Sequence, residues 1–320
     1  MSTVHYFRHD DAGAPTLTGE VGSLTNLLRK CLVGVGGVAY GAQASAGWTE
    51  SFIGAASNIA VFRNKISDGG SGCYVKVNDN AAQSGGARET TFTSYGSMTD
   101  INTGSAPTLD VYHRKSSALS NAARPWFLAA DGLTAWFYSW NSGDSTQYGR
   151  DCSITGFGDY ACVDVSNSYR YFALGRNVVN AVTGGLYACF STPENVPNTN
   201  WPSLNSMPLS GTGPSVAAFI DAVRFESGTA GPLGGAQLHS TPHPITGDYF
   251  YIRNPTIASS TNLLGRLRGL CLSLGRTSTL TGGSLVPGST DLVVIRGSSN
   301  STSNENIVFA AAIDKAGPWL

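Results

Sequence analysis

A pair of histidines four residues apart is the first feature of the sequence that could do chemistry. On a helix, His239 and His243 would share one face and could bind a metal ion together. Pro242 and Pro244 exclude a helix here, because proline removes a backbone donor and clashes with the preceding turn. We therefore expect both histidines to be solvated or to lie in an interface.

A second group of possible metal ligands lies near the start of the chain, where His5 and His9 are followed by Asp10. If residues 4–9 form a strand, the two histidines share a face but stand about 13 Å apart, too far to ligate one ion. The sequence therefore predicts no metal site.

Five aspartates could supply the paired carboxylates of a glycosidase, which must face each other across a sugar cleft. They are Asp79, Asp100, Asp131, Asp159 and Asp248. Asp131 and Asp159 stand next to turn-forming residues, which is typical of side chains that bond their own backbone. No spacing marks any two of the five as a catalytic pair, so we expect no catalytic residue among them.

Two glycine-rich segments resemble cofactor and nucleophile motifs only loosely. Residues 34–39 (GVGGVA) match the form of a dinucleotide-binding loop, but that loop needs a strand before it and a helix after it. Here a predicted helix comes first, so we interpret the segment as the loop that ends this helix. Ser71 lacks the G-x-S-x-G spacing of a nucleophile elbow, and only five histidines could supply its base. We expect no cofactor.

Charge and composition restrict the class of protein. The 320 residues include 20 Lys+Arg and 21 Asp+Glu, a formal net charge of −1, which lacks the basic excess that binds nucleic acid or an anionic membrane. Hydrophobic residues make up 41%, so the chain can bury enough apolar surface to offset its conformational entropy. Abundant Gly, Ser, Thr and aromatic residues favour strands and turns over helices.

Targeting signals and cysteines indicate where the chain is made. No apolar run reaches the roughly 18–20 residues that cross a bilayer, and the N-terminal residues do not resemble a secretory signal. We therefore expect synthesis in a cytoplasm, no membrane insertion, and reduced, buried cysteines, since no C-x-x-C pair occurs. The six cysteines are Cys31, Cys73, Cys152, Cys162, Cys189 and Cys271.

One helix is predicted, over residues 24–33. Its apolar residues at positions 24, 27, 28, 31 and 32 share one helix face. Ser23 is the expected N-cap, and Gly34 is the expected C-terminal stop.

Beyond Trp48 the pattern changes to short strands bounded by turn residues. The clearest unit is a hairpin in which the apolar runs 125–130 and 133–140 flank Asp131-Gly132. The further predicted strands are 59–63, 73–77, 88–95, 168–174, 186–190, 215–225, 249–253, 291–296 and 307–313. We expect four aromatic residues to anchor the core: Trp48, Trp126, Trp136 and Phe157.

These elements predict a mainly β fold, with antiparallel β-sandwich-like regions and one short N-terminal helix. Five prolines with Asn, Ser and Thr occupy residues 193–214 and show no hydrophobic periodicity. We interpret this segment as a connector, or alternatively as an ordered arm on a neighbour. The expected organisation is an N-terminal arm, helix and main β region (1–192), the connector (193–214) and a C-terminal β region (215–320).

Several short motifs, in this order along the chain, resemble a family of proteins. They are APTLTG (14–19) with GSLTNLL (22–28), GWTESF (47–52) with NIAVFR (58–63), YVKVND (74–79) with YGSMTD (95–100), ARPW (123–126) with ADG (130–132) and GFGD (156–159), and GRLRGL (265–270). The family is that of uncharacterised virion structural proteins of tailed bacteriophages and prophages. The resemblance covers most of residues 1–320 and is densest over 14–160.

The resemblance implies a non-enzymatic virion protein, assembled in the host cytoplasm, that forms part of the tail tip, trunk or fibre-attachment region. Its expected partners are copies of itself and neighbouring virion proteins, with edge strands as possible pairing surfaces. It lends no catalytic residue. Three alternatives stay open: a tail module that binds host-surface glycan or receptor, a capsid decoration protein, and a polysaccharide depolymerase.

Overall fold

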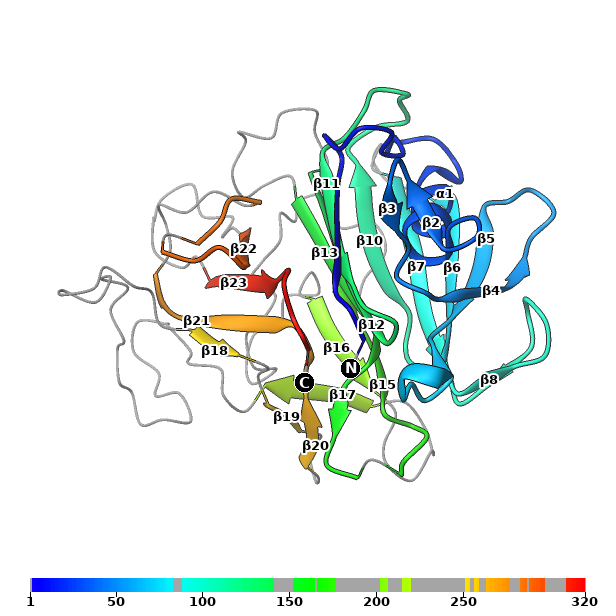
Figure 1. The fold of residues 1–320 in the computed structure, drawn as a ribbon. Helices are drawn as coiled ribbons and strands as arrows, with labels where there is room; N and C mark the ends of the chain where they lie inside the picture. Colours follow the sequence, from blue (N-terminus) through cyan, green and yellow to red (C-terminus); the bar gives the residue numbers. More distant parts are fainter. Residues whose placement is uncertain are drawn as a thin grey trace.

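A computed structural model describes residues 2–82, 88–140, 152–164, 166–176, 202–206, 215–219, 251–253, 256–258, 263–276, 283–286, 288–296 and 309–319. The fold is mainly antiparallel β with one short helix, which confirms the predicted fold class (Figure 1). The ends of the chain lie close together, with Val4 against Gly317.

The largest sheet has 15 strands and branches at β15 (Tyr171–Arg176). One branch leads from β15 through five strands: β10 (Val111–Ser116), β7 (Arg88–Tyr95), β6 (Tyr74–Ala82), β5 (Ile59–Arg63) and β4 (Thr49–Ile53). A second branch leads through four: β13 (Cys152–Asp159), β12 (Thr134–Trp140), β11 (Trp126–Ala130) and β1 (His5–Arg8). The two branches face each other across the larger hydrophobic core.

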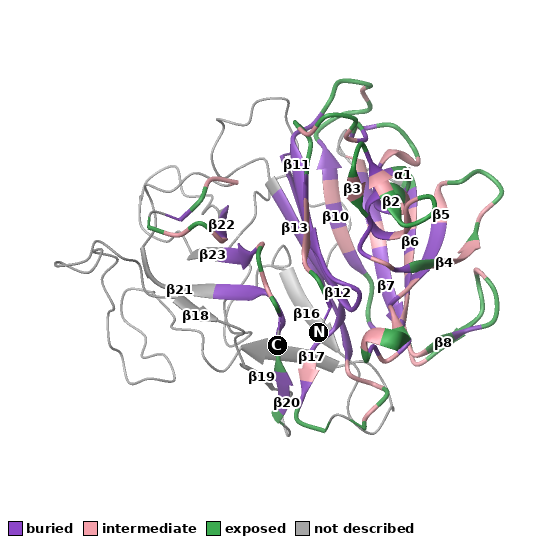
Figure 2. Ribbon diagram, viewed as in Figure 1, coloured by how far each residue is buried: buried purple, intermediate pink, exposed green. Residues whose placement is uncertain are grey.

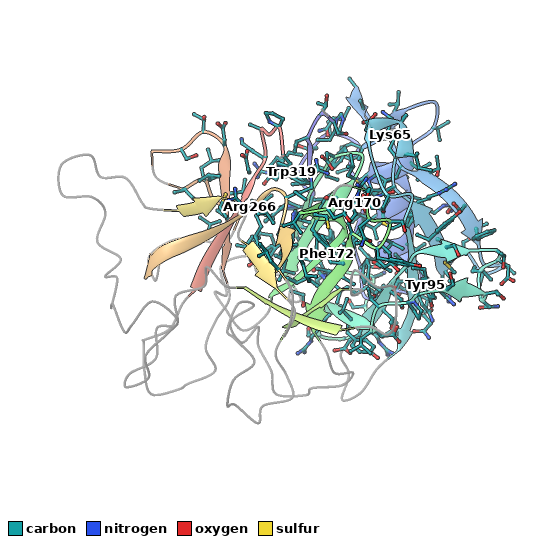
Figure 3. The ribbon with its side chains drawn as sticks, turned by 90° about the horizontal axis from the view of Figure 1, so that it is seen from below. Lys65, Tyr95, Arg170, Phe172, Arg266 and Trp319 are labelled. Atoms are coloured by element: carbon teal, nitrogen blue, oxygen red, sulfur yellow. The ribbon has the colours of Figure 1, made fainter. Side chains whose placement is uncertain are left out.

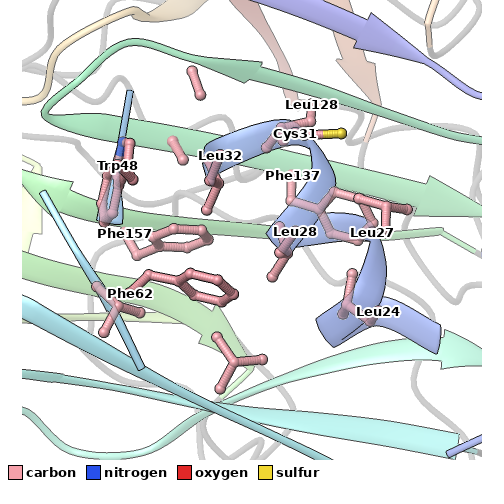
Figure 4. Close-up of a cluster of buried hydrophobic side chains, with 14 of the residues drawn as sticks. Leu24, Leu27, Leu28, Cys31, Leu32, Trp48, Phe62, Leu128, Phe137 and Phe157 are labelled. Atoms are coloured by element: carbon pink, nitrogen blue, oxygen red, sulfur yellow. The ribbon is translucent and has the colours of Figure 1, made fainter. Parts of the chain in front are cut away.

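The predicted helix fills the space between these branches. It consists of α1 (Ser23–Leu28) and a π-helical turn, η1 (Arg29–Val33), and Gly34 ends it with a φ of 69°. Its apolar face packs on aromatic side chains from both branches, including Phe62, Phe137 and Phe157 (Figure 4). The 3.6-residue periodicity therefore identified both the helix and its buried face.

The predicted Ser23 N-cap is wrong. Gly22 occupies the N-cap position with a φ of 79°, and the Ser23 hydroxyl donates to the carbonyl of Thr18 instead. The backbone N–H of Leu24 donates to the carboxylate of Asp79, 2.8 Å away on β6. A side chain 55 residues away in the sequence thus satisfies the free end of the helix.

The predicted hairpin is confirmed, since β11 and β12 pair from Trp126↔Ser139 to Ala130↔Ala135. Its strands show no alternation of buried and exposed residues, because every residue of both is buried (Figure 2). One face packs on the core around α1. The other packs on a second cluster with side chains from the C-terminal part of the chain. This middle layer explains the continuous aromatic runs of the sequence.

The C-terminal residues contribute a four-stranded sheet in the order β18 (Tyr251–Arg253), β21 (Leu270–Arg276), β23 (Phe309–Asp314) and β22 (Leu292–Arg296). The large sheet also continues from β15 through β16 (Pro202–Ser206), β17 (Ser215–Phe219), β19 (Thr256–Ala258) and β20 (Leu263–Arg266). It ends at β14 (Ala161–Cys162), which follows β13 in the chain. Trp319 lies between the small sheet and the rest of the molecule (Figure 3).

The predicted division into two β regions stays a prediction, because most of 193–214 lies outside the described residues. Within that segment, β16 (Pro202–Ser206) pairs with β15 and β17. The second hydrophobic cluster contains side chains from both predicted regions, such as Trp136 and Ile313.

Most other predicted strands are observed with small changes in their bounds. Residues 59–63 and 88–95 coincide with β5 and β7, and observed strands overlap 73–77, 168–174, 215–225, 249–253, 291–296 and 307–313. The predicted strand 186–190 lies outside the described residues. Three short elements complete the fold: the hairpins β2 (Val38–Tyr40)–β3 (Gln43–Ala44) and β8 (Ser97–Met98)–β9 (Gly104–Ser105), and the 3₁₀ turn η2 (Ile66–Asp68).

All four predicted core anchors are buried: Trp48, Trp126, Trp136 and Phe157 are 2% exposed or less. Gly156 stands opposite Trp136 in the β12–β13 pair, where a Cβ would lie 2.3 Å from the indole ring. The described cysteine side chains are also buried, as predicted: Cys31, Cys73, Cys162 and Cys271. Those of Cys152 and Cys189 lie outside the described residues.

Truncation of either middle-layer tryptophan tests this core. We expect Trp126→Ala and Trp136→Ala each to lower the free energy of unfolding by about 3–5 kcal/mol, because each leaves a large cavity. Urea unfolding measures the change. The control is Val35→Ala, whose side chain is 89% exposed and whose loss we expect to be small. Wild-type stability in both tryptophan variants would contradict the core assignment.

Candidate functional site

Asp131 is confirmed as a turn residue, and its carboxylate has a further role. Its Oδ1 accepts the N–H groups of Leu133 and Thr134 at 2.9 and 2.8 Å. Its Oδ2 accepts the Arg268 guanidinium at 2.7 Å, from the far end of the chain. Burial raises the pKa of this carboxyl, while Arg268 and the two N–H groups oppose that effect. The Asp131 carboxylate therefore closes the turn and anchors Arg268, in the C-terminal part of the chain, to this turn.

Asp159 does not bond its own backbone, so that part of the prediction is wrong. Its two carboxylate oxygens accept the N–H and the hydroxyl of Ser71, each at 2.6 Å, and Arg170 Nε lies 3.7 Å away. Burial is the main influence on this carboxyl and raises its pKa. Ser71 therefore ties its glycine-rich loop to the end of β13. Its hydroxyl donates to Asp159 and accepts the N–H of Cys73, an arrangement that holds the loop and does not activate a nucleophile.

Two of the other three candidate carboxylates also accept hydrogen bonds from the protein, and the third lies outside the described residues. Asp79 is buried, caps α1 and forms an ion pair with the equally buried Lys115, 2.6 Å away. Asp100 is exposed and accepts the backbone N–H groups of Asn102 and Thr103, which shape the β8–β9 turn. Asp248 lies outside the described residues. The four described carboxylates bond to separate partners, so none of them forms a glycosidase pair with another.

The histidines near the N-terminus lie on and just after a strand, as predicted. His5 begins β1, and His9 follows it with Nδ1 3.2 Å from the carbonyl oxygen of Trp126. Asp10 pairs with Arg8 at 2.7 Å on the surface. Within the described residues, no three His, Cys, Asp or Glu side chains gather where they would hold a metal ion. His239 and His243 lie outside those residues.

The expected pairing of edge strands across subunits finds two obstacles. Within the described residues, the large sheet ends in three strands, β1, β4 and β14, and the first two are obstructed. The Arg8 N–H of β1 already donates to the Asp11 carboxylate and to the Tyr40 hydroxyl. The register of β4 shifts between Glu50 and Phe52, and Glu50 forms an ion pair with Arg29 on η1 at 2.7 Å. Bonded donors, bulges and inward-facing charges all disfavour addition of another strand.

An uncharged loop offers a different contact surface. Residues 34–44 (GVGGVAYGAQA) contain no charged side chain, and Val35 and Val38 are 89% and 45% exposed. These two valines exchange backbone hydrogen bonds of 2.9 and 3.1 Å across Gly36 and Gly37. Both glycines have positive φ values, of 60° and 82°, which side chains other than glycine rarely adopt. We call residues 34–44 the valine loop.

Asp11 holds the base of the valine loop. Its Oδ2 accepts the Tyr40 hydroxyl at 2.7 Å and the Gln43 amide at 3.0 Å, besides the Arg8 N–H at 2.8 Å. The loop is thus tied to the strand β1 by side chains, and its apolar tip faces solvent. The sequence predicts that residues 34–39 are the loop that ends the helix, and Gly34 at the C-cap of η1 confirms this prediction.

A second surface lies on the outer face of β4–β7. Arg63, Tyr74 and Tyr95 stand directly opposite one another on adjacent strands, and all three are half-buried. Arg63 lies 4.9 Å from the centroid of the Tyr74 ring, and Phe52 stacks on the same ring at 6.5 Å. Tyr95 lies on the side of the molecule away from the C-terminal sheet (Figure 3). We call Phe52, Arg63, Tyr74 and Tyr95 the aromatic row.

The described tryptophans do not contribute to this surface. Trp48, Trp126, Trp136, Trp140 and Trp319 are 7% exposed or less, and Trp201 lies outside the described residues. Within the described part of the chain, no helix combines the length and the apolar character that crossing a membrane requires.

Two ion pairs have the same geometry but differ in burial, so comparing them isolates the effect of burial on stability. Arg268–Asp131 and Arg8–Asp10 each join Nη2 to Oδ2 at 2.7 Å, but the first pair is buried and the second is exposed. We expect Asp131→Ala to lower the free energy of unfolding by about 3–5 kcal/mol, since it leaves a buried guanidinium unpaired. Asp10→Ala should change it by about 1 kcal/mol or less. Equal losses by urea unfolding would contradict the anchoring role.

Comparison of the whole chain with protein-family models gives no match, and neither does comparison with curated proteins. The resemblance to virion proteins therefore stays a prediction.

Proposed function

We propose that this chain is a non-enzymatic structural protein of a tailed-bacteriophage virion, a component of the tail tip, trunk or fibre-attachment region. It acts by assembly with copies of itself and with neighbouring virion proteins. The ordered motifs of the sequence suggest the virion, and the layered β body with its firmly held surface loop supports an assembly role. No cofactor, nucleic acid or membrane enters this proposal.

The valine loop is the observation that carries the assembly proposal. A valine side chain that is 89% exposed at the tip of an uncharged loop gains free energy when another protein covers it. The Asp11 hydrogen bonds hold the loop before any partner arrives, so binding costs little conformational entropy. The edge strands β1 and β4 are obstructed, and the loop is a better contact surface than either of them.

The contacts of the candidate carboxylates support a non-enzymatic role. Asp79, Asp131 and Asp159 are buried and are satisfied by partners inside the fold. A glycosidase needs its two carboxylates free to reach a sugar. A depolymerase would therefore need residues beyond these three.

Gold-labelled antibody against the protein, viewed on intact virions by negative-stain electron microscopy, tests the proposed location. We expect label on the tail or at its tip. Label spread over the head would replace the tail role with capsid decoration. Virions without label and without the protein by mass spectrometry would overturn the structural role.

A charge at the tip of the valine loop tests the contact surface itself. We expect Val35→Asp to reduce incorporation into virions at least about tenfold, because a buried carboxylate without a partner costs more than 1.4 kcal/mol. Quantitative mass spectrometry of purified virions measures incorporation. Val163→Asp is the matched control, since Val163 is also exposed (58%) and directly follows β14, outside the valine loop. Equal incorporation of both variants would contradict the role of the loop.

A second candidate function is binding of a host-surface glycan, and the aromatic row favours it. Half-exposed aromatic rings beside a guanidinium offer both apolar surface and hydrogen-bond donors to a sugar. The row is part of a regular sheet, so its side chains are held at fixed spacing by strand pairing.

A glycan array of host-surface polysaccharides tests this second function. If the row binds glycan, Tyr74→Ala should weaken binding about tenfold, the effect of losing one contact worth about 1.4 kcal/mol. Tyr112→Ala on β10 is the control, because Tyr112 is half-buried and lies outside the row. No binding to the array, or equal binding by both variants, would remove this candidate.

A further inference from the structure

A buried amine and a buried carboxylate lie in contact inside the larger β region. Lys115 Nζ on β10 is 2.6 Å from Asp79 Oδ1 on β6, and both side chains are 0% exposed. The strand β7 separates β6 from β10 in the sheet, so the pair reaches across an intervening strand. Because bulk water does not reach either side chain, both charges have lost their usual hydration.

Four neighbouring groups form hydrogen bonds with the pair and orient it. Lys115 Nζ also donates to the carbonyl oxygen of Glu20 and, at 3.1 Å, to the Ser23 hydroxyl oxygen. Asp79 Oδ1 accepts the Thr90 hydroxyl at 2.9 Å, and Oδ2 accepts the Leu24 N–H at 2.8 Å. The third hydrogen of the ammonium is thus directed at the carboxylate.

We propose that Lys115 and Asp79 condense to form an intramolecular isopeptide bond that joins β10 to β6. The ammonium first transfers its third proton to Oδ1, which leaves a neutral amine beside a neutral carboxylic acid. The nitrogen lone pair, now directed at the carboxyl group, attacks Cγ. The Cγ–Oδ1 bond then breaks, and Oδ1 leaves as water with one more proton from the nitrogen. One amide and one water form, and nothing is oxidised or reduced.

The neighbours of the pair suit each step. The Leu24 N–H stabilises the negative charge that develops on Oδ2 in the tetrahedral intermediate. The Thr90 hydroxyl, bonded to Oδ1, can relay the second proton from nitrogen to the leaving oxygen. Burial lowers the pKa of the Lys115 amine, although Asp79 opposes this, and so favours the neutral form that attacks.

The proximity of the two groups and the exclusion of bulk water favour the amide over the free amine and carboxylic acid. Two reactants held in contact react as if at effective concentrations of about 10⁵–10⁸ M. The product also fits the site, because its N–H can donate to the Glu20 carbonyl and its Oδ2 still accepts the Leu24 N–H. The cost of two desolvated charges disappears when both become one neutral amide.

The intact mass of the folded wild-type protein tests the bond directly. We expect a mass lower than the sequence mass by one water. Tryptic digestion should yield a linked pair: the peptide of residues 77–88, which contains Asp79, and the peptide that begins at Lys115. A folded protein with the full sequence mass would overturn the proposal and leave the contact as an ion pair.

Two variants separate this bond from other losses of water, such as cyclisation of an aspartate with its own backbone. Lys115→Arg keeps the positive charge but cannot form the amide, so its mass should equal its sequence mass. Asp79→Asn should form the same link with loss of ammonia. A water deficit that persists in Lys115→Arg would overturn the proposal, even if Asp79→Asn fails to fold. The measurement uses the purified chain, so its result is independent of the proposed place in a virion.

Discussion

The turn between β11 and β12 is the constraint on which most of the tertiary structure depends. The turn carbonyls accept the Trp48 indole at Asp131 and the Lys65 N–H at Gly132, each at 2.7 Å. The Gly132 N–H donates to the hydroxyl of Ser2 at the start of the chain, and the Asp131 carboxylate holds Arg268 near its end. Four separate segments thus meet at two consecutive residues. A Cβ at position 132 would come within about 3 Å of the side chains of Ser2, Asp68 and Lys65, so glycine leaves room for these contacts.

This turn joins two strands that are buried on both faces, and this burial makes the hydrogen bonds of the turn necessary. A middle layer can exist only if its polar groups are satisfied internally, because water reaches neither face. The turn is satisfied by Asp131, and the indole of Trp136 donates to the carbonyl of Arg268 at 2.8 Å. The same arginine therefore serves the turn with its guanidinium and the middle layer with its backbone. Its neighbour Trp319 closes the second core.

The proposed roles follow from how the fold distributes polar groups. The carboxylates and hydroxyls that were candidates for catalysis form hydrogen bonds that hold distant segments together. Uncharged apolar side chains, in contrast, remain exposed on the valine loop. A body of this kind is suited to fixed contacts with neighbours rather than to turnover of a substrate. An internal amide between β6 and β10 would suit the same purpose, since it would resist separation of the strands that carry the helix.

Local features were predictable from the sequence alone. The periodicity of α1, the aromatic runs of β11 and β12 and the glycine stop after the helix depend on near neighbours, and these determine backbone conformation directly. The sequence also determined that Trp48, Trp126, Trp136 and Phe157 are buried, because large aromatic side chains in apolar or glycine-rich strand segments gain free energy when they leave water. The pairing of distant groups was not predictable in this way. Asp79 with Leu24, Asp159 with Ser71 and Asp131 with Arg268 come together only when the strands are stacked. Each buried carboxylate must find donors wherever packing excludes water, and the tertiary structure alone decides which donors lie within reach.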